Sequence, residues 1–291
     1  MDIKFFNKDI TEVIKKRSSI RTYKPVALSE EVESDLKNYS NSIESPFSSE
    51  VRFVFLNDDS FVKETGGKIG TYGVIKGAKN FVTGVVKEDE AYSLLNLGYT
   101  LEKLILYATS LGLGTCWLGG TFNIKGLDKL TGLKENEFLP IITPIGYPDT
   151  KKSMIDKIMK TAAGSKKRKS WEKLFFNNSI NSPITKEKAG YYETPLEMVR
   201  LAPSASNFQP WRIIKENNNW HFFMEYSKVV NKAIGFDIQK IDMGIAMCHF
   251  ELSALEKGLN GQWIINDKLD ITCFEGINNL QYIATWEEHG S

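Results

Sequence analysis

The stretch that decides the fold is Gly98-Tyr-Thr-Leu-Glu-Lys-Leu-Ile-Leu-Tyr-Ala-Thr-Ser-Leu-Gly-Leu-Gly-Thr-Cys-Trp117, and it has a counterpart from Gly244 to Trp263. Apolar residues from Leu94 to Leu111 recur at three- and four-residue steps, which predicts a helix with two buried faces that stops at Gly112. Five residues of this stretch recur later in the chain, each at the same offset as Gly98 and Gly244. The other pairs are Ala108 and Ala254, Gly112 and Gly258, Leu113 and Leu259, and Trp117 and Trp263. A constant spacing across a helix, its glycine stop and a tryptophan indicates an internal duplication.

A duplication has a structural consequence, because two copies of one apolar surface pack most easily against each other around a pseudo-two-fold axis. A looser echo of Ile141-Ile-Thr143 at Ile283-Ala-Thr285 agrees with it. The alternative is that two unrelated buried helices each end in Gly-Leu. Duplication accounts for more of the matched positions, and we therefore expect two related halves in one chain.

The composition is that of an ordinary globular protein and argues against several classes of partner. Of the 291 residues, 42% are hydrophobic and 25% are charged, so extensive disorder is not expected. The 37 basic and 36 acidic residues leave a formal net charge of +1, which gives no electrostatic reason to bind nucleic acid or an anionic membrane. The most apolar helical stretch is interrupted by Asn96, Glu102 and Lys103, and it does not read as a membrane span.

Cysteine and histidine usage gives no sign of a disulfide framework or a metal site. Cys116, Cys248 and Cys273 are isolated and odd in number, which disfavours disulfides and structural zinc. The three histidines show no metal spacing, and His249 on an apolar helix is expected to be a core or boundary residue. The first residues lack the apolar core of a signal peptide. Because the cysteines do not indicate disulfides, a reducing cytoplasm is the expected location.

Further elements follow from capping residues, β-branched runs and prolines. Asp9 with Glu12 predicts the start of a first helix, and Ser29 predicts the start of a second. Strands are expected over 51–56, 81–86 and 139–148. Thr194-Pro-Leu-Glu197 reads as the capping box of a short helix, which must end by residue 202 because a proline follows.

Two basic segments carry groups suited to an anion. Arg17-Ser-Ser-Ile-Arg21 places two guanidinium groups and two hydroxyls within five residues, and arginine offers a fork of donors matched to phosphate oxygens. A solvated basic turn is the alternative for this segment taken alone. The lysine-rich connector 149–173 has the same two interpretations, a solvated linker or a phosphate-facing segment.

The segment Ala202-Pro-Ser-Ala-Ser-Asn-Phe-Gln-Pro-Trp211 is more specific. Pro203 ends a helix, and the small residues after it let the backbone approach a flat ligand closely. Gly119-Gly120 would offer backbone N–H groups to a ligand atom that gains negative charge, or would form an ordinary tight turn. Gly112-Leu-Gly114 is not a dinucleotide fingerprint, because these glycines close a helix instead of opening one.

These motifs together resemble those of the FMN-dependent nitroreductase superfamily. Arg17–Tyr23 is similar to its amino-terminal phosphate-binding segment, Leu111–Gly120 to its helix-end and flavin-edge segment, and Ala202–Trp211 to its most recognisable motif. With Pro144–Pro148 and the basic run after it, the similarity touches nearly the whole chain. It implies an α+β fold of the three-layer α/β/α type, with residues 1–165 and 166–291 as two tandem halves that form an intramolecular pseudo-dimer.

The resemblance also implies which residues would hold FMN. Four amino-terminal residues would bind the phosphate, the ribityl chain and the pyrimidine edge, and these are Arg17, Ser18, Ser19 and Arg21. Lys167 or Arg168 would add phosphate charge, and Leu118, Gly119 and Gly120 would line the flavin edge near N5. The other half would cover the ring with Pro203, Ser204, Ala205 and Asn207. The glycine-rich excursion around Gly70–Gly73 would also line the pocket, although it lacks the asparagine and lysine often found there in relatives.

The motifs are distributed unequally between the two halves. In ordinary members of the family one half-length chain carries all of them, and two chains pair around each flavin. Here Ile43–Ser49 stands where the first half should have Pro-Ser-x-x-Asn, and Gly261–Asn266 stands where the second half should have the double glycine. The two halves would therefore complete one flavin site, in a monomer that acts as a pseudo-dimer.

The activity implied by the resemblance is the passage of electrons from NAD(P)H through FMN to a small organic acceptor such as a nitroaromatic, a quinone or an enone. No side chain stands out as a dedicated acid, base or nucleophile, so none is named as catalytic. One alternative is a flavin-binding sensor or storage protein without turnover. Another is a dehalogenase or flavin-fragmenting enzyme, which would add a lid of charged residues that this sequence does not show.

Overall fold

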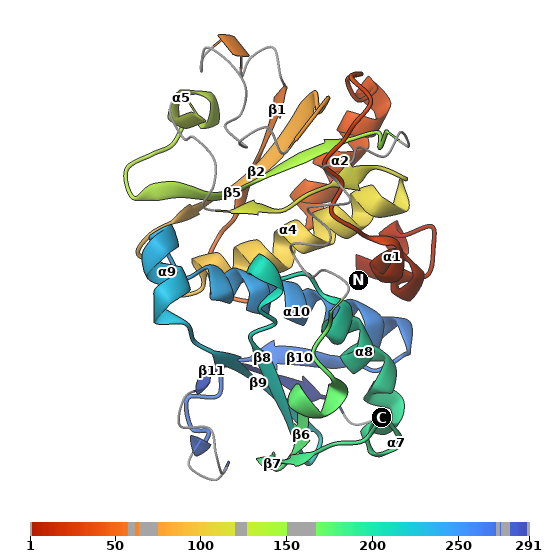
Figure 1. Ribbon diagram of the computed structural model, residues 1–291, viewed down its shortest axis with the longest axis vertical. Coiled ribbons are helices and arrows are strands. Elements are labelled where there is room, and N and C mark those ends of the chain that lie inside the picture. The colour runs from red at the N-terminus through yellow and green to blue at the C-terminus, as the bar shows by residue number, and fades with distance from the viewer. Residues whose placement is uncertain are drawn as a thin grey trace.

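Two β-sheets lie on opposite sides of a pair of long helices, α4 (Ser93–Ser110) and α10 (Ile238–Glu256) (Figure 1). The computed structural model describes residues 2–57, 62–63, 75–119, 127–149, 167–271, 274 and 280–289. Strands between residues 52 and 146 build one sheet, and strands between 175 and 288 build the other. The fold is therefore α+β, with two sheets packed through their long helices, as expected.

The first sheet has the strand order β1-β2-β5-β3, with β4 also paired to β5, and every pairing is antiparallel. Its strands are β1 (Arg52–Asn57), β2 (Asn80–Lys87), β3 (Gly114–Thr115), β4 (Leu118–Gly119) and β5 (Glu137–Gly146). Val82 and Ile141 on one face join the core around α4, whereas Phe81 and Ile142 on the other face pack with Leu127 of α5 (Leu127–Thr131). Helices thus cover both faces, which is the predicted three-layer arrangement.

The second sheet has the order β10-β11-β9-β8-β6-β7. Its strands are β6 (Phe175–Asn177), β7 (Ser179–Pro183), β8 (Trp211–Glu216), β9 (Asn219–Glu225), β10 (Gly261–Ile264) and β11 (Leu280–Glu288). Strand β6 runs parallel to β8, and the other pairs are antiparallel. The series β8-β9-β11-β10 has the same succession of antiparallel neighbours as β1-β2-β5-β3 in the first sheet.

Helices α4 and α10 touch backbone to backbone where they cross. A Cβ atom on Gly98 would lie 2.1 Å from the carbonyl oxygen of Ile241, and one on Gly244 would lie 2.0 Å from the carbonyl oxygen of Leu95 and 3.0 Å from Cα of Gly98. The two glycines matched in the sequence therefore meet each other at the crossing. Only glycine at both positions lets the helices approach this closely.

Both long helices end in the same way. Gly112 has φ +83° and Gly258 has φ +75°, a left-handed conformation that glycine adopts without strain. The next residue in each case, Leu113 or Leu259, donates its N–H to a carbonyl five residues earlier, over 3.0 Å. The predicted stop at Gly112 is confirmed, and α4 is buried on nearly all sides, which exceeds the two buried faces that periodicity indicated.

Shorter helices surround this core. They are α1 (Ile10–Lys16), α2 (Glu30–Ser42), α7 (Lys186–Ala189), α8 (Glu193–Leu201) and α9 (Lys228–Ile234), with 3₁₀ turns at Asp2–Phe5, Trp171–Lys173, Gly190–Tyr192 and Ala205–Asn207. Ser29 caps α2 as predicted, accepting the Val32 N–H at 3.4 Å. The end of α8 before residue 202 is also confirmed.

Helix α1 begins directly after Asp9, as predicted, but two predicted capping contacts are not made. The Asp9 side chain makes no capping hydrogen bond, and the Ile10 N–H at the start of α1 is bound instead by the carboxylate of Glu256 from the end of α10. Helix α8 begins at Glu193, directly after a 3₁₀ turn, and Glu197 binds Arg200 at 2.9 Å instead of capping the helix. In both places another side-chain contact replaces the predicted cap.

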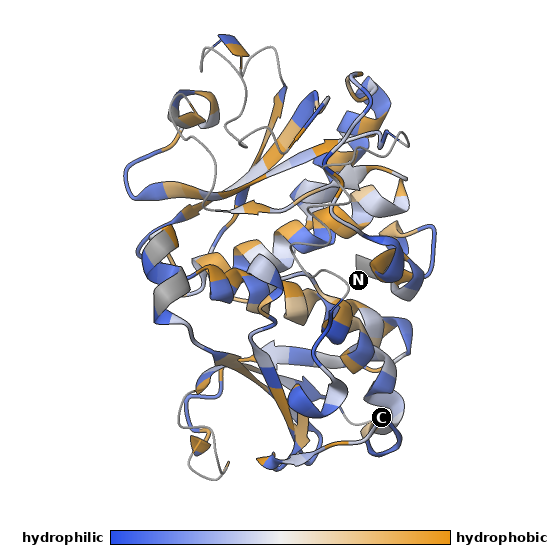
Figure 2. Ribbon diagram, in the orientation of Figure 1, coloured by the Kyte–Doolittle hydropathy of each residue, from blue (hydrophilic) through white to orange (hydrophobic). Residues whose placement is uncertain are grey.

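Apolar residues concentrate along the two long helices and the strands that face them (Figure 2). Within the described residues no helix is long and apolar enough to span a membrane. The same residues contain no cluster of His, Cys, Asp and Glu that could hold a metal ion. Cys116 and Cys248 are buried, and Cys273 lies outside the described residues.

Candidate functional site

The amino-terminal basic segment runs along the end of the first sheet. Helix α1 ends at Lys16, and the backbone after Arg17 becomes extended. Ser19 forms a parallel bridge with Thr115, where the Ile20 N–H donates to the Thr115 carbonyl at 2.8 Å. The backbone carbonyl of Arg21 accepts the Lys76 N–H at 2.8 Å. Ser18 is exposed, and Ser19 and Arg21 are half-buried. The segment is therefore held by its backbone, which leaves its side chains available.

Arg17 has a buried guanidinium group, two of whose nitrogens meet no hydrogen-bond acceptor among the described residues. Its side chain is only 8% exposed, and Nε lies 3.7 Å from Oε1 of Glu102. Within the described part of the chain, neither Nε nor Nη1 has a hydrogen-bond partner. An unpaired buried donor on a charged group is costly, so this arginine is suited to receive an anion.

Glu102 ties Arg17 to both long helices. Its carboxylate is fully buried and accepts the indole N–H of Trp117 at 2.8 Å, while Nε2 of His249 lies 2.9 Å from the other oxygen. Nδ1 of His249 faces the Met198 carbonyl at 2.9 Å and must donate to it. A hydrogen bond between Nε2 of His249 and Glu102 therefore requires a second proton, carried by Nε2 or by the carboxyl group. His249 is a core histidine, as predicted, but it is also part of this network.

The polar turn after α8 has an unusual backbone. Ser206, Asn207 and Gln209 have φ values of 50°, 56° and 52°, which side-chain-bearing residues rarely adopt. The Ala205 N–H donates to Oδ1 of Asp242 at 2.9 Å and helps to hold this shape. Burial raises the pKa of the Asp242 carboxyl well above its ordinary value and favours the neutral acid.

Arg168 joins the connector to this turn. One end of its guanidinium donates to Oδ1 of Asn207, and the other donates to the Leu201 carbonyl at 2.8 Å. Burial lowers the pKa of Arg168 to about 10, and the positive charges of Arg17 and Arg200 contribute to the shift. Arg17 and Arg168 are thus close enough to repel each other, although they lie on opposite sides of the boundary predicted at 165. Two neighbouring guanidinium groups are suited to an anionic ligand.

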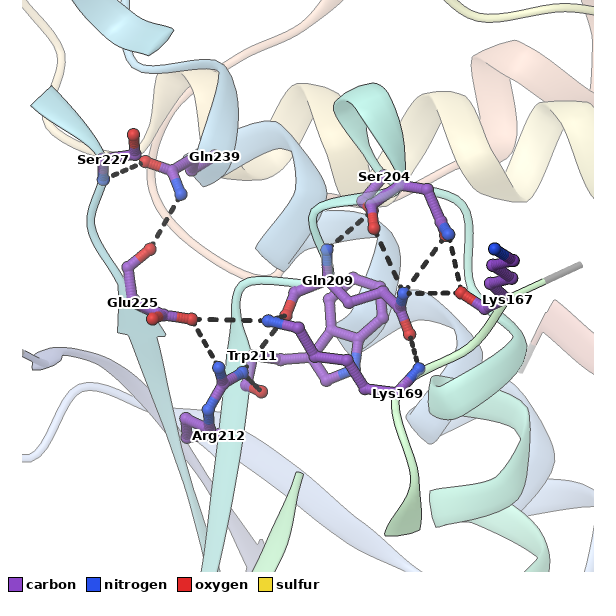
Figure 3. Close-up of polar contacts among 10 residues, drawn as sticks. Lys167, Lys169, Ser204, Gln209, Trp211, Arg212, Glu225, Ser227 and Gln239 are labelled. Carbon is purple, nitrogen blue, oxygen red and sulfur yellow. Dashed lines mark hydrogen bonds and ion pairs between the residues drawn. The ribbon is translucent and has the colours of Figure 1, made fainter. Parts of the chain in front are cut away.

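Gln209 is the centre of the contacts between the turn and the connector (Figure 3). Its side-chain oxygen accepts the Lys169 N–H at 2.7 Å, and its amide donates to the Lys167 carbonyl at 3.3 Å. Its backbone N–H donates to the Ser204 hydroxyl at 2.9 Å. Asn207 completes the link by donating to the Lys167 carbonyl at 2.8 Å. The Lys167 side chain is exposed, so here the backbone of this residue makes the contacts.

Glu225, at the end of β9, anchors the same region to the second sheet (Figure 3). Its carboxylate pairs with Lys169 at 3.4 Å and with the guanidinium of Arg212. Its carbonyl accepts the amide of Gln239 at 2.7 Å, and Gln239 in turn accepts the Ser227 N–H at 2.6 Å. The turn is therefore braced by the connector and by the sheet, and Gln239 joins the end of β9 to the first turn of α10.

The predicted flavin edge lies against the amino-terminal end of α10. Leu118 and Gly119 pair with β5, and both are half-buried. A Cβ atom on Gly119 would lie 2.8 Å from Cδ1 of Ile141 and 3.0 Å from Cδ1 of Ile238. Gly120 and the excursion around Gly70–Gly73 lie outside the described residues.

Sequence reasoning brought together Arg17, Arg168 and the turn at Asn207, and it missed the residues that hold them. Those residues are Glu102, Asp242 and, as a hydrogen-bonding group, His249, whereas Gln209 belongs to the Ala202–Trp211 motif found in the sequence. The signal that could have found them was a charged residue inside an otherwise apolar helix, as at positions 102 and 242. Buried charges are paired or hydrogen-bonded, so such a position indicates a partner elsewhere in the chain.

Comparison with known proteins gives one family match. Residues 9–254 match a family model described as "Putative TM nitroreductase". No protein with a curated description matches the chain. A crystal structure from Thermotoga maritima MSB8, of a protein described as a "putative nitroreductase", superposes with a TM-score of 0.61 at 19% identity over 96% of this chain and 93% of that one.

Two further solved structures cover about half of the chain. A protein of Bacteroides thetaiotaomicron VPI-5482, described as "Putative NADH dehydrogenase/NAD(P)H nitroreductase", has a TM-score of 0.42 at 22% identity over 50% of this chain and 90% of its own. An "FMN-dependent Nitroreductase" of Clostridium difficile R20291 has a TM-score of 0.40 at 22% identity over 48% of this chain and 88% of its own.

Proposed function

We propose a function for this chain, which belongs to the nitroreductase family whose model it matches over residues 9–254. Enzymes of this family are oxidoreductases. We propose that this protein binds one FMN, takes electrons from NAD(P)H and passes them to a small organic acceptor such as a nitroaromatic, a quinone or an enone. When bound, FMN supplies the two-electron chemistry, and the protein supplies binding, orientation and electrostatics.

One observation carries the proposal. Among the described residues, two buried guanidinium nitrogens of Arg17 have no hydrogen-bond partner, and Arg17 lies within electrostatic range of Arg168, which is hydrogen-bonded to Asn207 of the polar turn. Two cations and a turn with a left-handed backbone converge from the two parts of the chain. An FMN phosphate fits this donor set in charge and in hydrogen-bonding capacity.

Each part of the site has a proposed task. Arg17 and Arg168 hold the phosphate, assisted by Ser18, Ser19, Arg21 and Lys167. The backbone at Leu118, Gly119 and Gly120 offers N–H groups at the flavin edge, where negative charge develops on reduction. The turn residues Pro203, Ser204, Ala205 and Asn207 cover the ring. Within the described residues no side chain is assigned as an acid, base or nucleophile.

We also propose that residues 1–165 and 166–291 are duplicated halves and that the chain works as a cytoplasmic monomer with one site. Support comes from the contact between Gly98 and Gly244, the matching ends at Gly112 and Gly258, and the shared order of four strands in the two sheets. Because the amino-terminal phosphate segment Arg17–Arg21 and the polar turn come from different halves, one chain completes the site alone.

The test is the flavin content of purified protein and of two variants. We expect about one FMN per chain by absorbance, and loss of most of it in Arg17→Ala and Asn207→Ala, which lie on opposite sides of the seam. Arg52→Ala is the matched control, because this arginine pairs with Glu137 at 2.7 Å in the first sheet and takes no part in the site. Normal flavin in both site variants, or two flavins per chain, would contradict the shared single site.

A second measurement separates an enzyme from a flavin store. Stopped-flow mixing of the loaded protein with NADH or NADPH should bleach the yellow colour, and an added quinone or nitroaromatic should restore it over many turnovers. A protein that holds FMN but is reduced by neither nucleotide would be a sensor or storage protein, and the oxidoreductase assignment would be wrong.

A further inference from the structure

Asn96 and Asp242 are two buried polar side chains at corresponding positions of the long helices. Each lies two residues before the glycine at which α4 and α10 cross, so the pair has the same spacing as Gly98 and Gly244. Asn96 is fully buried, and Asp242 is 3% exposed. A buried carboxyl or amide beside a backbone crossing is expensive unless it binds something specific.

Each of these side chains anchors the segment that leads into the first strand of its own sheet. The amide of Asn96 donates to the carbonyls of Phe47 and Ser49 at 2.9 and 2.7 Å, just before β1. Oδ1 of Asp242 accepts the Ala205 N–H at 2.9 Å, before β8. The position in the fold is the same, whereas the hydrogen bond runs in the opposite direction.

The reversed hydrogen bond accompanies a different backbone. The segment held by Asn96 presents carbonyl groups to the helix and contains no described residue with positive φ. The segment held by Asp242 presents an N–H, and the next two residues, Ser206 and Asn207, have φ of 50° and 56°. This left-handed pair directs the Asn207 side chain to Arg168 and to the connector.

We propose that Asp242 is a positioning residue of the ligand site: by accepting the Ala205 N–H it fixes the left-handed turn and thereby the Asn207 contact with Arg168. Asn96 holds the corresponding segment of the first half, and this segment lacks the Pro-Ser-x-x-Asn residues of the polar turn. Asp242 acts through the turn and does not touch the ligand. The inference rests on the proposed function only where FMN affinity is the measured quantity.

The chemistry predicts which replacement preserves this role. Burial raises the pKa of the Asp242 carboxyl, so the group resembles a neutral amide more than a carboxylate. Its Oδ2 has no hydrogen-bond partner among the described residues. Asp242→Asn keeps an oxygen that can accept the Ala205 N–H and has nearly the same volume. Asp242→Leu keeps the approximate volume but removes the acceptor.

The experiment compares Asp242→Asn, Asp242→Leu and the matched control Asn96→Leu. We expect Asp242→Leu to weaken FMN binding to the apoprotein at least tenfold, and Asp242→Asn to stay within threefold of the wild type. Asn96→Leu should lower the melting temperature by a similar amount to Asp242→Leu but leave FMN affinity within threefold. If either leucine variant does not fold, the alanine pair Asp242→Ala and Asn96→Ala makes the same comparison.

Two results would overturn the proposal. One is an Asp242→Leu protein that binds FMN as the wild type does, and the other is an Asn96→Leu protein that loses FMN equally. Hydrogen exchange at the Ala205 amide gives a readout without flavin, and it should be slow in the wild type and in Asp242→Asn but fast in Asp242→Leu. If the wild type binds no FMN but this exchange pattern holds, the proposed function fails while the positioning role stands. Equal exchange in all three proteins refutes that role.

Discussion

Substitution of Gly98 by alanine tests the backbone contact between the two long helices. The added methyl would lie 2.1 Å from the carbonyl oxygen of Ile241 and 2.9 Å from its Cα. Unstrained carbon contacts are about 3.5–4.0 Å, so the helices would have to separate by roughly 1 Å or more. No side-chain rotation can relieve the clash, because the obstructing atoms belong to the backbone of α10.

The expected loss of stability follows from two opposing terms. Overpacking a core usually costs about 1–3 kcal/mol, and a rigid backbone obstacle places this case at or above the upper end. Alanine in a helix regains about 1 kcal/mol over glycine. The net loss should therefore be about 2 kcal/mol or more, which corresponds to a fall in melting temperature of roughly 4–8 °C.

The assay is thermal and urea unfolding of Gly98→Ala beside Gly112→Asn. Gly112 has φ +83°, and a Cβ atom added there would meet no other atom within 4 Å. Asparagine tolerates this backbone best among side-chain-bearing residues, so the control should lose less than about 1 kcal/mol. In Gly98→Ala combined with Gly244→Ala, the second substitution should cost less than it does alone, because both separate the same helices. A Gly98→Ala protein as stable as the wild type would refute the reasoning.

Three other predictions concern the ion pairs and the buried acid. Arg168→Lys should weaken FMN binding about tenfold in a fluorescence titration, because lysine lacks the planar guanidinium that reaches both Asn207 and the Leu201 carbonyl at the end of α8. Unchanged affinity would show that this double contact is not needed. As the pH rises above 3.8, the free energy of unfolding of the wild type should fall relative to that of Asp242→Asn, by up to about 1.4 kcal/mol per pH unit. The reason is that the Asp242 carboxyl loses its proton at lower pH in the unfolded chain than in the folded one. Parallel pH profiles of the two proteins in urea titrations would contradict the raised pKa. Glu225→Gln should lower stability by about 1 kcal/mol, since Arg212 loses its carboxylate partner, and a melting temperature equal to the wild type would show that the pair contributes nothing.

Local sequence was sufficient for most of the secondary structure. The long helix was predictable because Leu94–Leu111 repeats apolar residues at helical spacing, and its end because Gly112 alone tolerates the left-handed stop. Ser29 and the proline after Ala202 also acted locally, and both predictions are confirmed. The predicted capping contacts at Asp9 and Thr194 are not made. The remote Glu256 carboxylate binds the Ile10 N–H at the start of α1, and Glu197 binds Arg200 one turn later in α8.

The sequence by itself determined the α+β class, the positions of the long helices and the motifs that identify the family. It could not determine which carboxylate faces Arg17, because Glu102 approaches this arginine, and His249 contacts Glu102, only after the two long helices have crossed. Nor could it assign Asp242 to the Ala205 N–H, a contact across 37 positions of the chain. Periodicity and caps depend on neighbours a few residues apart, whereas the partners of a buried charge are chosen by tertiary packing.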